Sequence, residues 1–340
     1  MDEVPQGAGI LKNYRVVRML AILALALGIS TARADKARLT THREMMSRLA
    51  SLETIDSLFR SNRIEVICIG RSVKGKDIPL VVVSDPSVPI ELTKRLFIIC
   101  RQHGDEPAPT EAMLNLIEDL AFASDDSAAD LLSKVSFFIV PMMNPDGADA
   151  YKRRNANSAD LNRDWLTLGQ PETRCVRAAI DAVAPDVLVD QHELGPGNNR
   201  SDFVETAGTA SGASAEVVSE SLQLQHLVIG MLRTHDIGVV SYQIDDKHPA
   251  RLAHRYFPIH GSTKTLLFET RQSGARRYRL QYRVKLHIVG TMTLAKYLAG
   301  RDDELRQRIA AHDSWRKSVQ LASRKKRPGY AGISTTRRKR

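Results

Sequence analysis

The sequence predicts an α/β fold: a single domain with a twisted, mixed and largely parallel sheet that has helices on both faces. The first observation is that short apolar stretches of strand length alternate with amphipathic stretches of helix length from residue 64 to about residue 311. The second is that hydrophobic residues make up 43% of the 340 residues, which is enough to fill a core.

The first half of the chain begins with a predicted helix over residues 35–60, polar on one face. Strands over 64–70 and 78–83 follow, joined by a turn, and then a strand over 96–100 and another over 135–142. Between the last two, a helix over 109–122 is indicated by one apolar stripe at i, i+3, i+4 and i+7, formed by Met113, Leu116, Ile117 and Leu120. Asn144-Pro145-Asp146-Gly147 predicts a turn.

The second half continues the alternation of helices and strands. Pro171 opens a helix that is expected to reach Val183, because proline is favoured in the first turn of a helix. The remaining predictions are a strand over 187–190, a helix over 214–235, a strand over 263–268 and a pair of helices over roughly 279–311.

The N-terminus has the pattern of a secretory signal peptide over residues 1–34. Basic residues precede an apolar run over 19–30, and Ala32-Arg33-Ala34 fits the small-x-small cleavage rule. Twelve apolar residues are too few to cross a bilayer, which needs roughly 20. We expect export to the periplasm or the outside, the alternative being a chain that an uncleaved N-terminal segment holds at the membrane.

The net charge of +10 is concentrated at the C-terminus. Residues 316–340 carry ten basic residues and no acidic one, so the rest of the chain has 39 of each sign. This predicts a near-neutral body over 58–312, preceded by a helical lead-in over 35–57 and followed by a basic, disordered tail over 313–340. The tail is expected to contact anionic surfaces, and no specific nucleic-acid partner is predicted.

The three cysteines do not form a disulfide framework for a chain of this length. Cys68 and Cys100 lie in apolar, strand-like runs, so buried free thiols are expected. A bridge between these two remains open, and no CxxC pair indicates a thiolate metal site.

Polar residues follow four of the predicted strands at the point where each ends. His103 and Glu106 come after residues 96–100, His192 after 187–190 and Glu269 after 263–268, and the segment 153–165 follows the strand over 135–142. Ligands of open α/β sheets bind beyond the carboxyl ends of the strands. The functional site is therefore expected at that edge.

His103, Glu106 and His192 are candidate ligands of one metal ion. A set of two histidines and one glutamate, with the fourth position left to water, is typical of a catalytic zinc site. The His-x-x-Glu pair alone is a weak signal, because ten histidines and 39 acidic residues produce such pairs by chance.

Further motifs occur in a fixed order with this set. They are Asn144-Pro145-Asp146-Gly147, Arg153-Arg154-Asn155, Asp160-Leu161-Asn162-Arg163 and Glu269-Thr270-Arg271. From about Leu58 to Leu298 the sequence thereby resembles the zinc metallocarboxypeptidases, the carboxypeptidase A-like exopeptidases, in a compact form of bacterial type. The resemblance implies a peptide-bond hydrolase with one zinc ion per chain, held at the C-terminal ends of the strands.

The resemblance also implies a role for each matching residue. Glu269 is expected to be the general base, and Arg153, or else its neighbour Arg154, to stabilise the oxyanion. Asn162 and Arg163 are expected to grip the terminal carboxylate of the substrate. Asp160 is expected to orient a zinc-bound histidine.

Two features depart from the family pattern. Glu193 replaces a small polar residue after the third ligand, and it would place a carboxylate near the metal or point away from it. The tyrosine that closes over the substrate has two candidates, Tyr242 and Tyr256.

Two other functions compete with peptide hydrolysis. One is a zinc amidohydrolase that acts on small N-acyl amino acids or cell-wall peptides with the same ligands. The other is a non-catalytic protein that binds polyanions through the basic tail. Substrates with a free carboxylate are expected for both of the enzymes.

Overall fold

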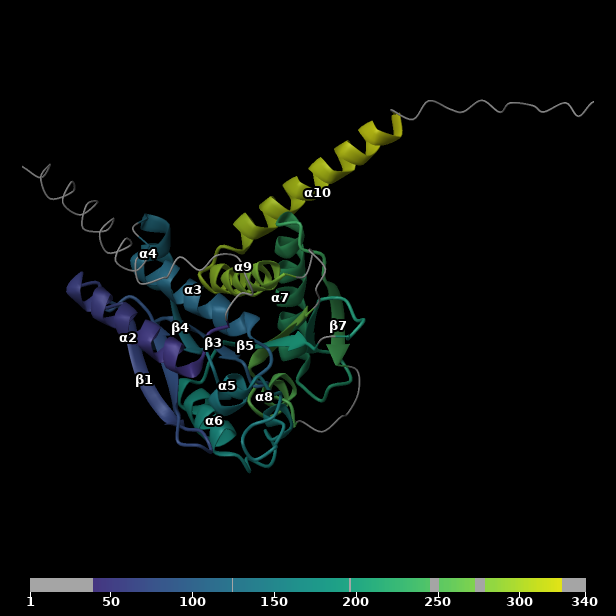
Figure 1. Ribbon diagram of the computed structural model, residues 1–340. Coiled ribbons are helices and arrows are strands. Elements are labelled where there is room, and N and C mark those ends of the chain that lie inside the picture. The colour runs from purple at the N-terminus through teal and green to yellow at the C-terminus, as the bar shows by residue number, and fades with distance from the viewer. Residues whose placement is uncertain (1–38, 124, 196, 245–250, 273–278, 326–340) are drawn as a thin grey trace, which may run out of the picture. The chain divides into compact units, whose positions relative to one another are not determined.

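In the computed structural model, residues 39–123, 125–195, 197–244, 251–272 and 279–325 are described, and Figure 1 shows their arrangement. These ranges contain one mixed sheet of eight strands in the order β1-β2-β4-β3-β5-β8-β6-β7. The strands are β1 (Ile64–Arg71), β2 (Asp77–Val83), β3 (Lys94–Cys100), β4 (Val135–Val140), β5 (Val187–Leu194), β6 (Phe203–Ala207), β7 (Val240–Ile244) and β8 (Lys264–Arg271).

The central strands β4, β3, β5 and β8 run parallel to one another, and β6 and β7 also pair in parallel. The pairs β1–β2, β2–β4 and β6–β8 are antiparallel. The prediction of a mixed, largely parallel sheet is therefore confirmed.

Helices cover both faces of this sheet, as predicted (Figure 1). One apolar cluster joins the sheet to α2, α3, α7 and α9, and a second joins its other face to α6 and α8. The helices are α2 (His42–Leu58), α3 (Ala108–Phe122), α4 (Asp126–Leu132), α5 (Pro145–Ala150), α6 (Pro171–Val183), α7 (Ala215–Thr234), α8 (Ala253–His260), α9 (Leu280–Leu298) and α10 (Asp302–Lys325).

Local sequence signals explain several helix starts. The Thr41 hydroxyl accepts a hydrogen bond from Glu44 N, and the Glu44 carboxylate accepts one from Thr41 N, so α2 begins with a capping box. Ser214 caps α7 in the same way, with its hydroxyl accepting from Val217 N. Helix α6 begins at Pro171 and ends at Val183, as the sequence predicts.

Some elements are not apparent from the sequence. Strands β6 and β7 are five residues each, and β6 has Glu205 at its centre, so neither has the apolar run that marks the other strands. Helix α8 contains Pro258, which weakens the helical signal. The turn predicted at residues 144–147 is instead the start of α5, with Asn144 as its cap.

Helix α10 continues to Lys325, so residues 313–325 are helical rather than disordered. Its first turns pack on α7, where Leu305 lies in a small apolar cluster with Leu227 and Met231. The expectation of disorder for the rest of the tail and that of a signal peptide fall on residues 326–340 and 1–34, outside the described ranges.

The sheet topology excludes a disulfide between Cys68 and Cys100. Cys68 lies on β1 and Cys100 on β3, with β2 and β4 between them, a separation of about 14 Å at the usual strand spacing. Bridged cysteines have Cα atoms less than about 7 Å apart. Cys100 is buried as predicted, but Cys68 is exposed because β1 is an edge strand.

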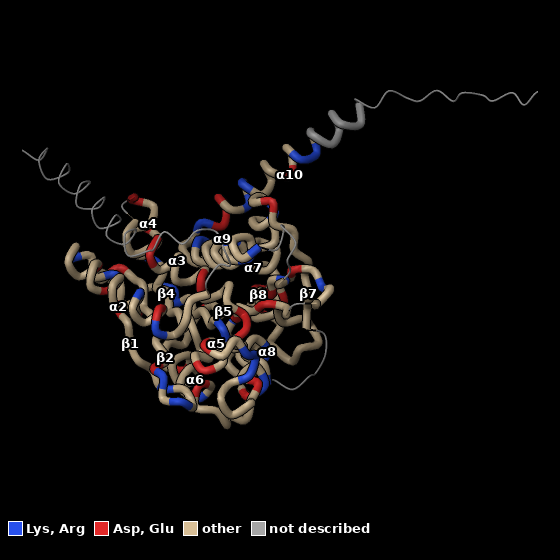
Figure 2. Tube along the Cα trace, in the orientation of Figure 1, with Lys and Arg blue, Asp and Glu red and all other residues tan. Residues whose placement is uncertain are grey.

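Basic and acidic positions are interspersed along the described part of the chain (Figure 2). Within the same ranges, no helix is both long enough and apolar enough to cross a membrane.

Candidate metal centre and active site

The three predicted metal ligands lie at the carboxyl edge of the central parallel strands. His103 and Glu106 are in the loop between β3 and α3, and His192 is near the end of β5, the neighbour of β3. All three side chains are buried, and one ligand atom from each lies within 4.8 Å of the others. The parallel pairing of β3 and β5 therefore brings together residues that are 89 positions apart.

The Nδ1 atoms of the two histidines face each other at 3.1 Å. The Glu106 carboxylate bridges them, with Oε1 at 2.7 Å from His103 Nδ1 and Oε2 at 2.8 Å from His192 Nδ1. Two imidazole nitrogens and a carboxylate thus converge on one point.

The other ring nitrogen of each histidine is held by a second carboxylate. His103 Nε2 lies 3.1 Å from Asp160 Oδ1, and His192 Nε2 lies 2.9 Å from Asp190 Oδ1. A carboxylate can only accept, so each Nε2 is the donor and the Nδ1 lone pairs are available to a metal. This carboxylate–histidine arrangement is characteristic of zinc-binding histidines, and the residues present fit a zinc ion.

The carboxylates of this cluster are ionised at neutral pH. Burial raises the pKa of Glu106, but the positive charges of His103 and His192 outweigh burial and lower it to about 2. In the same way, burial of Asp190 is outweighed by His192 and His254, which lower its pKa. The pKa of His192 is raised well above its usual value, because Asp190 and Glu106 together outweigh the effect of burial. The buried carboxylates therefore favour a positive charge at this cluster, which a proton on the histidines supplies without a metal and which a metal cation bound at the Nδ1 atoms would replace.

Glu269 lies beside the cluster on β8, where it is the register partner of His192. Register partners point to the same face of a sheet, so the two side chains share one face. Burial raises the pKa of Glu269 to about 8, the negative charges of Glu106 and Asp190 add to the rise, and His192 opposes it. Its Oε2 atom is buried and accepts no hydrogen bond within the described residues.

Arg153, rather than Arg154, reaches the cluster. Its guanidinium donates two hydrogen bonds to Asp160 Oδ2, at 3.2 and 3.1 Å, and approaches Glu106 Oε1 at 3.4 Å. Arg154 instead donates to the Ser158 carbonyl and lies in solvent. Of the two neighbours that the sequence leaves open, Arg153 is thus the one that lies at the cluster.

Asn162 and Arg163 lie on a short 3₁₀ turn between α5 and α6 that Asp160 caps by accepting from Asn162 N at 3.1 Å. The Asn162 side chain touches the cluster, with Nδ2 at 3.1 Å from His192 Nε2. Arg163 is exposed next to it and donates to the Asn162 carbonyl. The two residues are thereby held at the rim of the metal cluster.

Asn155 fixes the loop that carries these residues. Its Oδ1 accepts from Asn157 N and Ala159 N, and its Nδ2 donates to Gln170 Oε1 and Glu172 Oε2. Asn155 is buried, and all of these bonds are within 3.1 Å. The Asn of the Arg-x-Asn motif therefore positions the loop from within.

Three residues of the site are absent from the sequence motifs. Asp190 holds His192, and Gln102 donates to Asp190 Oδ1 at 2.6 Å. His254 on α8 lies between Asp190 Oδ2 at 3.3 Å and Glu205 Oε1 at 3.0 Å. Asp190 could have been identified from the sequence, because it stands two residues before His192 and residues with this spacing share one face of a strand. Gln102 and His254 have none, because tertiary packing alone brings them there.

Glu193 points away from the metal cluster, to the opposite face of the sheet. Its carboxylate accepts from Ala108 N at 2.7 Å and from the Arg283 guanidinium of α9. Of the two tyrosine candidates, Tyr256 packs under the Arg177 guanidinium of α6. Tyr242 packs edge-on against Phe203, the register partner of Glu269 on β6.

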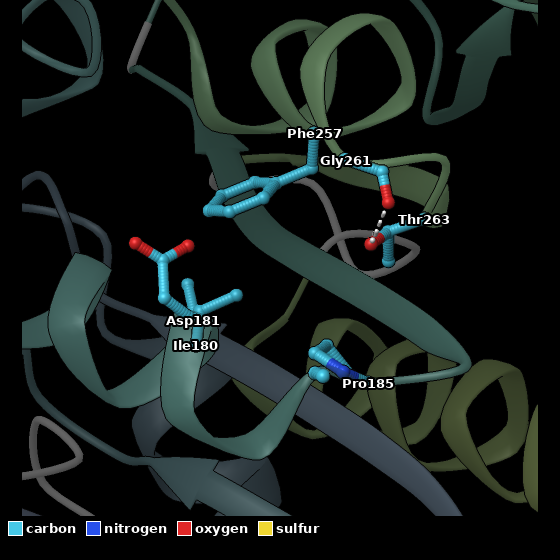
Figure 3. A pocket seen from close by; sticks show the side chains of 7 residues that line it. Ile180, Asp181, Pro185, Phe257, Gly261 and Thr263 are labelled. Atoms are coloured by element: carbon cyan, nitrogen blue, oxygen red, sulfur yellow. Dashed lines mark hydrogen bonds between the residues drawn. The ribbon is translucent and has the colours of Figure 1, made fainter.

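A small pocket lies between α6 and α8, and Figure 3 shows Phe257 and Asp181 among the side chains that line it. Pro185 and Thr263 line it just before β5 and β8 begin, so it lies at the amino ends of these strands, opposite the metal cluster. Its one titratable residue, Asp181, is paired with Arg177 at 2.8 Å. It has no part in the candidate active site.

The sequence pattern of the Peptidase_M14 family, described as zinc carboxypeptidase, matches residues 52–221, half of the chain. This chain belongs to the zinc carboxypeptidase family. It is similar to Carboxypeptidase 2 of Trichophyton rubrum, with 32% identity over 151 residues that are 42% of this chain and 28% of that protein. It is also similar to carboxypeptidase SOL1 of Arabidopsis thaliana, with 36% identity over 120 residues, 32% of this chain and 24% of that protein. The chain thus spans about a quarter of the length of these relatives.

Solved structures share the fold. A metallo-carboxypeptidase from Burkholderia cenocepacia is 24% identical, with a TM-score of 0.62 over 75% of this chain and 68% of that one. A metallo-carboxypeptidase from Pseudomonas aeruginosa, solved with (2-guanidinoethylmercapto)succinic acid, is 24% identical with a TM-score of 0.60 over 77% and 69% of the two chains. The α/β architecture is therefore that of metallocarboxypeptidases.

Proposed function

We propose that this protein is a zinc metallocarboxypeptidase that removes C-terminal residues from peptides. The observation that carries the proposal is the convergence of His103 Nδ1, His192 Nδ1 and the Glu106 carboxylate, with Glu269 beside them on β8. Membership of the zinc carboxypeptidase family supports the choice of metal.

His103, Glu106 and His192 would hold the zinc ion. When bound, zinc supplies Lewis-acid chemistry, in that it polarises a carbonyl group and acidifies water. Asp160 and Asp190 keep the histidine rings in the tautomer that exposes Nδ1, so they preserve the site in its binding form.

Glu269 would take a proton from the attacking water and deliver it to the amine that leaves. Its Oε2 has no internal partner within the described residues, so it is available for this transfer. A nearby cation lowers the pKa of a carboxyl group, which would bring the value of about 8 toward neutrality. A pKa near the working pH is the most effective for general acid–base catalysis.

Arg153 would bind the oxygen of the scissile carbonyl, and Asn162 and Arg163 would bind the terminal carboxylate of the substrate. Arg153 lies against the ligand cluster, where a guanidinium can stabilise the negative oxygen of the tetrahedral intermediate. Arg163 is exposed beside Asn162, and a guanidinium binds a carboxylate through two parallel hydrogen bonds. Recognition of a terminal carboxylate would make the enzyme an exopeptidase.

The proposal is tested with zinc-loaded protein and pairs of peptides that differ only in a free or an amidated C-terminus, with products identified by mass spectrometry. Stepwise loss of C-terminal residues from the free peptide alone is expected. Release of acyl groups from N-acyl amino acids without peptide cleavage would favour the amidohydrolase. Inactivity toward both substrate classes would leave polyanion binding as the function.

We further propose that the chain is exported and cleaved after Ala34. The support is the sequence alone: basic residues, an apolar run over 19–30 and then Ala32-Arg33-Ala34. N-terminal sequencing of protein from the producing cells should start at Asp35. Recovery of intact Met1 in the membrane fraction would indicate the uncleaved form instead.

We also propose that the basic tail binds anionic surfaces, because residues 316–340 carry ten positive and no negative charges. Removing these residues should abolish co-sedimentation with vesicles containing anionic lipid at low salt and leave hydrolysis of a soluble peptide unchanged. Equal sedimentation of both chains would contradict the role of the tail.

A further inference from the structure

The segment from Arg251 to Arg255, at the start of α8, forms a wall directly beside Asn162 and Arg163. Ala253 N donates to Asn162 Oδ1 at 3.3 Å, and Trp165 N donates to the Arg251 carbonyl at 3.3 Å. These two contacts attach the segment that carries Asn162 and Arg163 to the start of α8. Arg251 and Arg255, which flank Ala253, are therefore placed next to the residues proposed to bind the terminal carboxylate.

Four arginines contribute positive charge to this region. The pKa of Arg163 is lowered first by burial, and then by the positive charges of Arg153, Arg251 and Arg255, while Asp160 opposes the shift. The two contacts with the start of α8 are the geometric reason that Arg251 and Arg255 contribute to the electrostatic surroundings of Arg163. A guanidinium group stays protonated in proteins, so the cluster is positive at every physiological pH.

Glu205 is the carboxylate that β6 contributes to the same face of the sheet. Its register partner on β8 is Leu267, two residues before Glu269, so Glu205 and Glu269 point to the same side. Glu205 Oε1 accepts from His254 Nε2 at 3.0 Å and approaches Arg255 Nη2 at 3.5 Å, and its side chain is only 15% exposed. The Glu205 carboxylate thus contacts both His254 and Arg255, and it holds the Arg255 side chain in place.

The other carboxylates nearby are also engaged. Asp160 binds the Arg153 guanidinium through two hydrogen bonds and His103 through a third. Asp190 is fully buried between His192 and His254. Among the described residues, the carboxylates near this wall are thus all paired with positive groups of the protein. The exposed side chains of Arg163 and Arg251 leave positive charge facing solvent.

We propose that this wall selects peptides whose C-terminal residue has an acidic side chain. The inference rests on the proposed carboxypeptidase function and names its substrate class. Arg163 and Asn162 take the α-carboxylate, and Arg251 and Arg255 attract the second carboxylate of the same residue. A charge-assisted hydrogen bond from a guanidinium to a carboxylate favours the acidic side chain, and a lysine or arginine side chain meets like charge.

The test compares three N-acylated dipeptides that end in Glu, Gln or Lys, with zinc-loaded full-length protein. Gln has the shape of Glu without its charge, so the ratio of the two kcat/KM values isolates the charge. We expect the Glu substrate to be favoured over Gln by about tenfold and over Lys by more, mainly through KM. The preference should shrink as salt is raised, because these arginines are partly exposed.

Arg251→Gln and Arg255→Gln should each reduce kcat/KM for the Glu substrate severalfold and leave the Gln substrate nearly unchanged. Arg251 is exposed, so its variant is expected to fold even where Arg255→Gln disturbs Glu205. Arg71→Gln, which removes the same charge from the exposed edge of β1, is the matched control and should retain the wild-type ratio.

Hydrolysis of the Gln or Lys substrate at least as fast as the Glu substrate would overturn the inference while supporting the proposed function. Retention of the full Glu preference by both variants would also overturn the role of the two arginines. Failure of the zinc-loaded enzyme to hydrolyse any of the three substrates or a mixed peptide library would count against the proposed function itself.

Discussion

His192 and Glu193 are neighbours on β5, but they lie on opposite faces of the sheet and their surroundings differ. On the His192 face, two Nδ1 atoms and the Glu106 carboxylate converge, and the outer sides of both rings are held by other carboxylates. On the Glu193 face, the carboxylate accepts from a backbone N–H of α3 and from Arg283 of α9. The first arrangement leaves ligand atoms facing one another, and the second pairs a buried negative charge with an internal positive one.

The difference between the two faces shows that burial of charge serves two purposes in this protein. A buried ion pair is stable only when both partners remain, since removing one leaves an uncompensated charge. A cluster whose lone pairs converge is completed by a cation from outside. We therefore expect substitutions on the two faces to differ in their main effect, which is activity or metal affinity on one face and stability on the other.

The largest effect is expected from Glu269→Gln on the His192 face. The amide cannot take a proton from water, and loss of a general base lowers kcat by about 10²–10⁴-fold. Bound zinc and the free energy of unfolding should stay near the wild-type values. Steady-state kinetics, metal analysis and urea unfolding measure the three quantities, with Glu220→Gln on the surface of α7 as the control. A variant with normal kcat would remove Glu269 from the proposed mechanism.

On the opposite face, Arg283→Met should lower the free energy of unfolding by about 1–3 kcal/mol. Burial raises the pKa of Glu193 to about 7, so without Arg283 this carboxyl group is protonated and stays in the core without its hydrogen-bond donor. Arg283→Met with Glu193→Gln should recover most of this loss, since both charges are then gone. Urea unfolding monitored by circular dichroism gives the three values. A single variant as stable as the wild type would show that the pair contributes little.

The contacts on the His192 face can be predicted from the sequence, whereas those on the Glu193 face cannot. His103 and Glu106 follow β3, and His192 and Glu269 lie in the last residues of β5 and β8, so the rule that sites form at strand ends is enough to group them from residue order alone. Arg283 is 90 positions from Glu193 and belongs to a run of basic residues with no marked periodicity. Whether Glu193 faces the metal depends on the register of β5, which the residue order leaves undecided.

Local signals also decide which elements of the fold can be predicted from the sequence. The central strands and α6 are predicted because apolar runs and Pro171 are local signals. Strand β6 and helix α8 carry Glu205 and Pro258 at positions that weaken such signals, and their conformations depend on pairing with β8 and packing on the sheet. The arginines proposed to select the substrate side chain lie at the start of α8, and Glu205 of β6 contacts one of them, so this is the least predictable part of the site.

On the His192 face again, Asp190→Asn should weaken zinc binding by about 10–100-fold, the usual effect of removing a carboxylate that orients a metal-binding histidine. Asp181→Asn, at the opposite edge of the sheet, should leave zinc affinity unchanged. Competition with a chromogenic chelator measures both affinities. Equal affinities would mean that Asp190 does not orient His192.

The smallest predicted effect is a dependence of the free energy of unfolding on pH, which His287 causes on the Glu193 face. Burial lowers the pKa of His287 to about 3, and the charge of Arg283 adds to the shift. The unfolded chain has the ordinary value of 6.5. Between these values the unfolded state binds the extra proton, so the stability of the fold falls by about 1.4 kcal/mol per pH unit as the pH drops below 6.5.

His287→Gln should remove this part of the acid sensitivity, measured as the slope of unfolding free energy between about pH 6.5 and 5. His226→Gln, on the exposed side of α7, should keep the wild-type slope. Equal slopes for all three proteins would contradict the assignment of the proton to His287.

The metal content of the protein tests the central claim most directly. Mass spectrometry of purified, dialysed samples should find one zinc ion per chain in the wild type and in Glu193→Gln, and none in His103→Asn with His192→Asn. Circular dichroism would verify that all three proteins are folded. Absence of zinc from wild type supplied with the metal, or a full equivalent retained without the two histidines, would contradict the site.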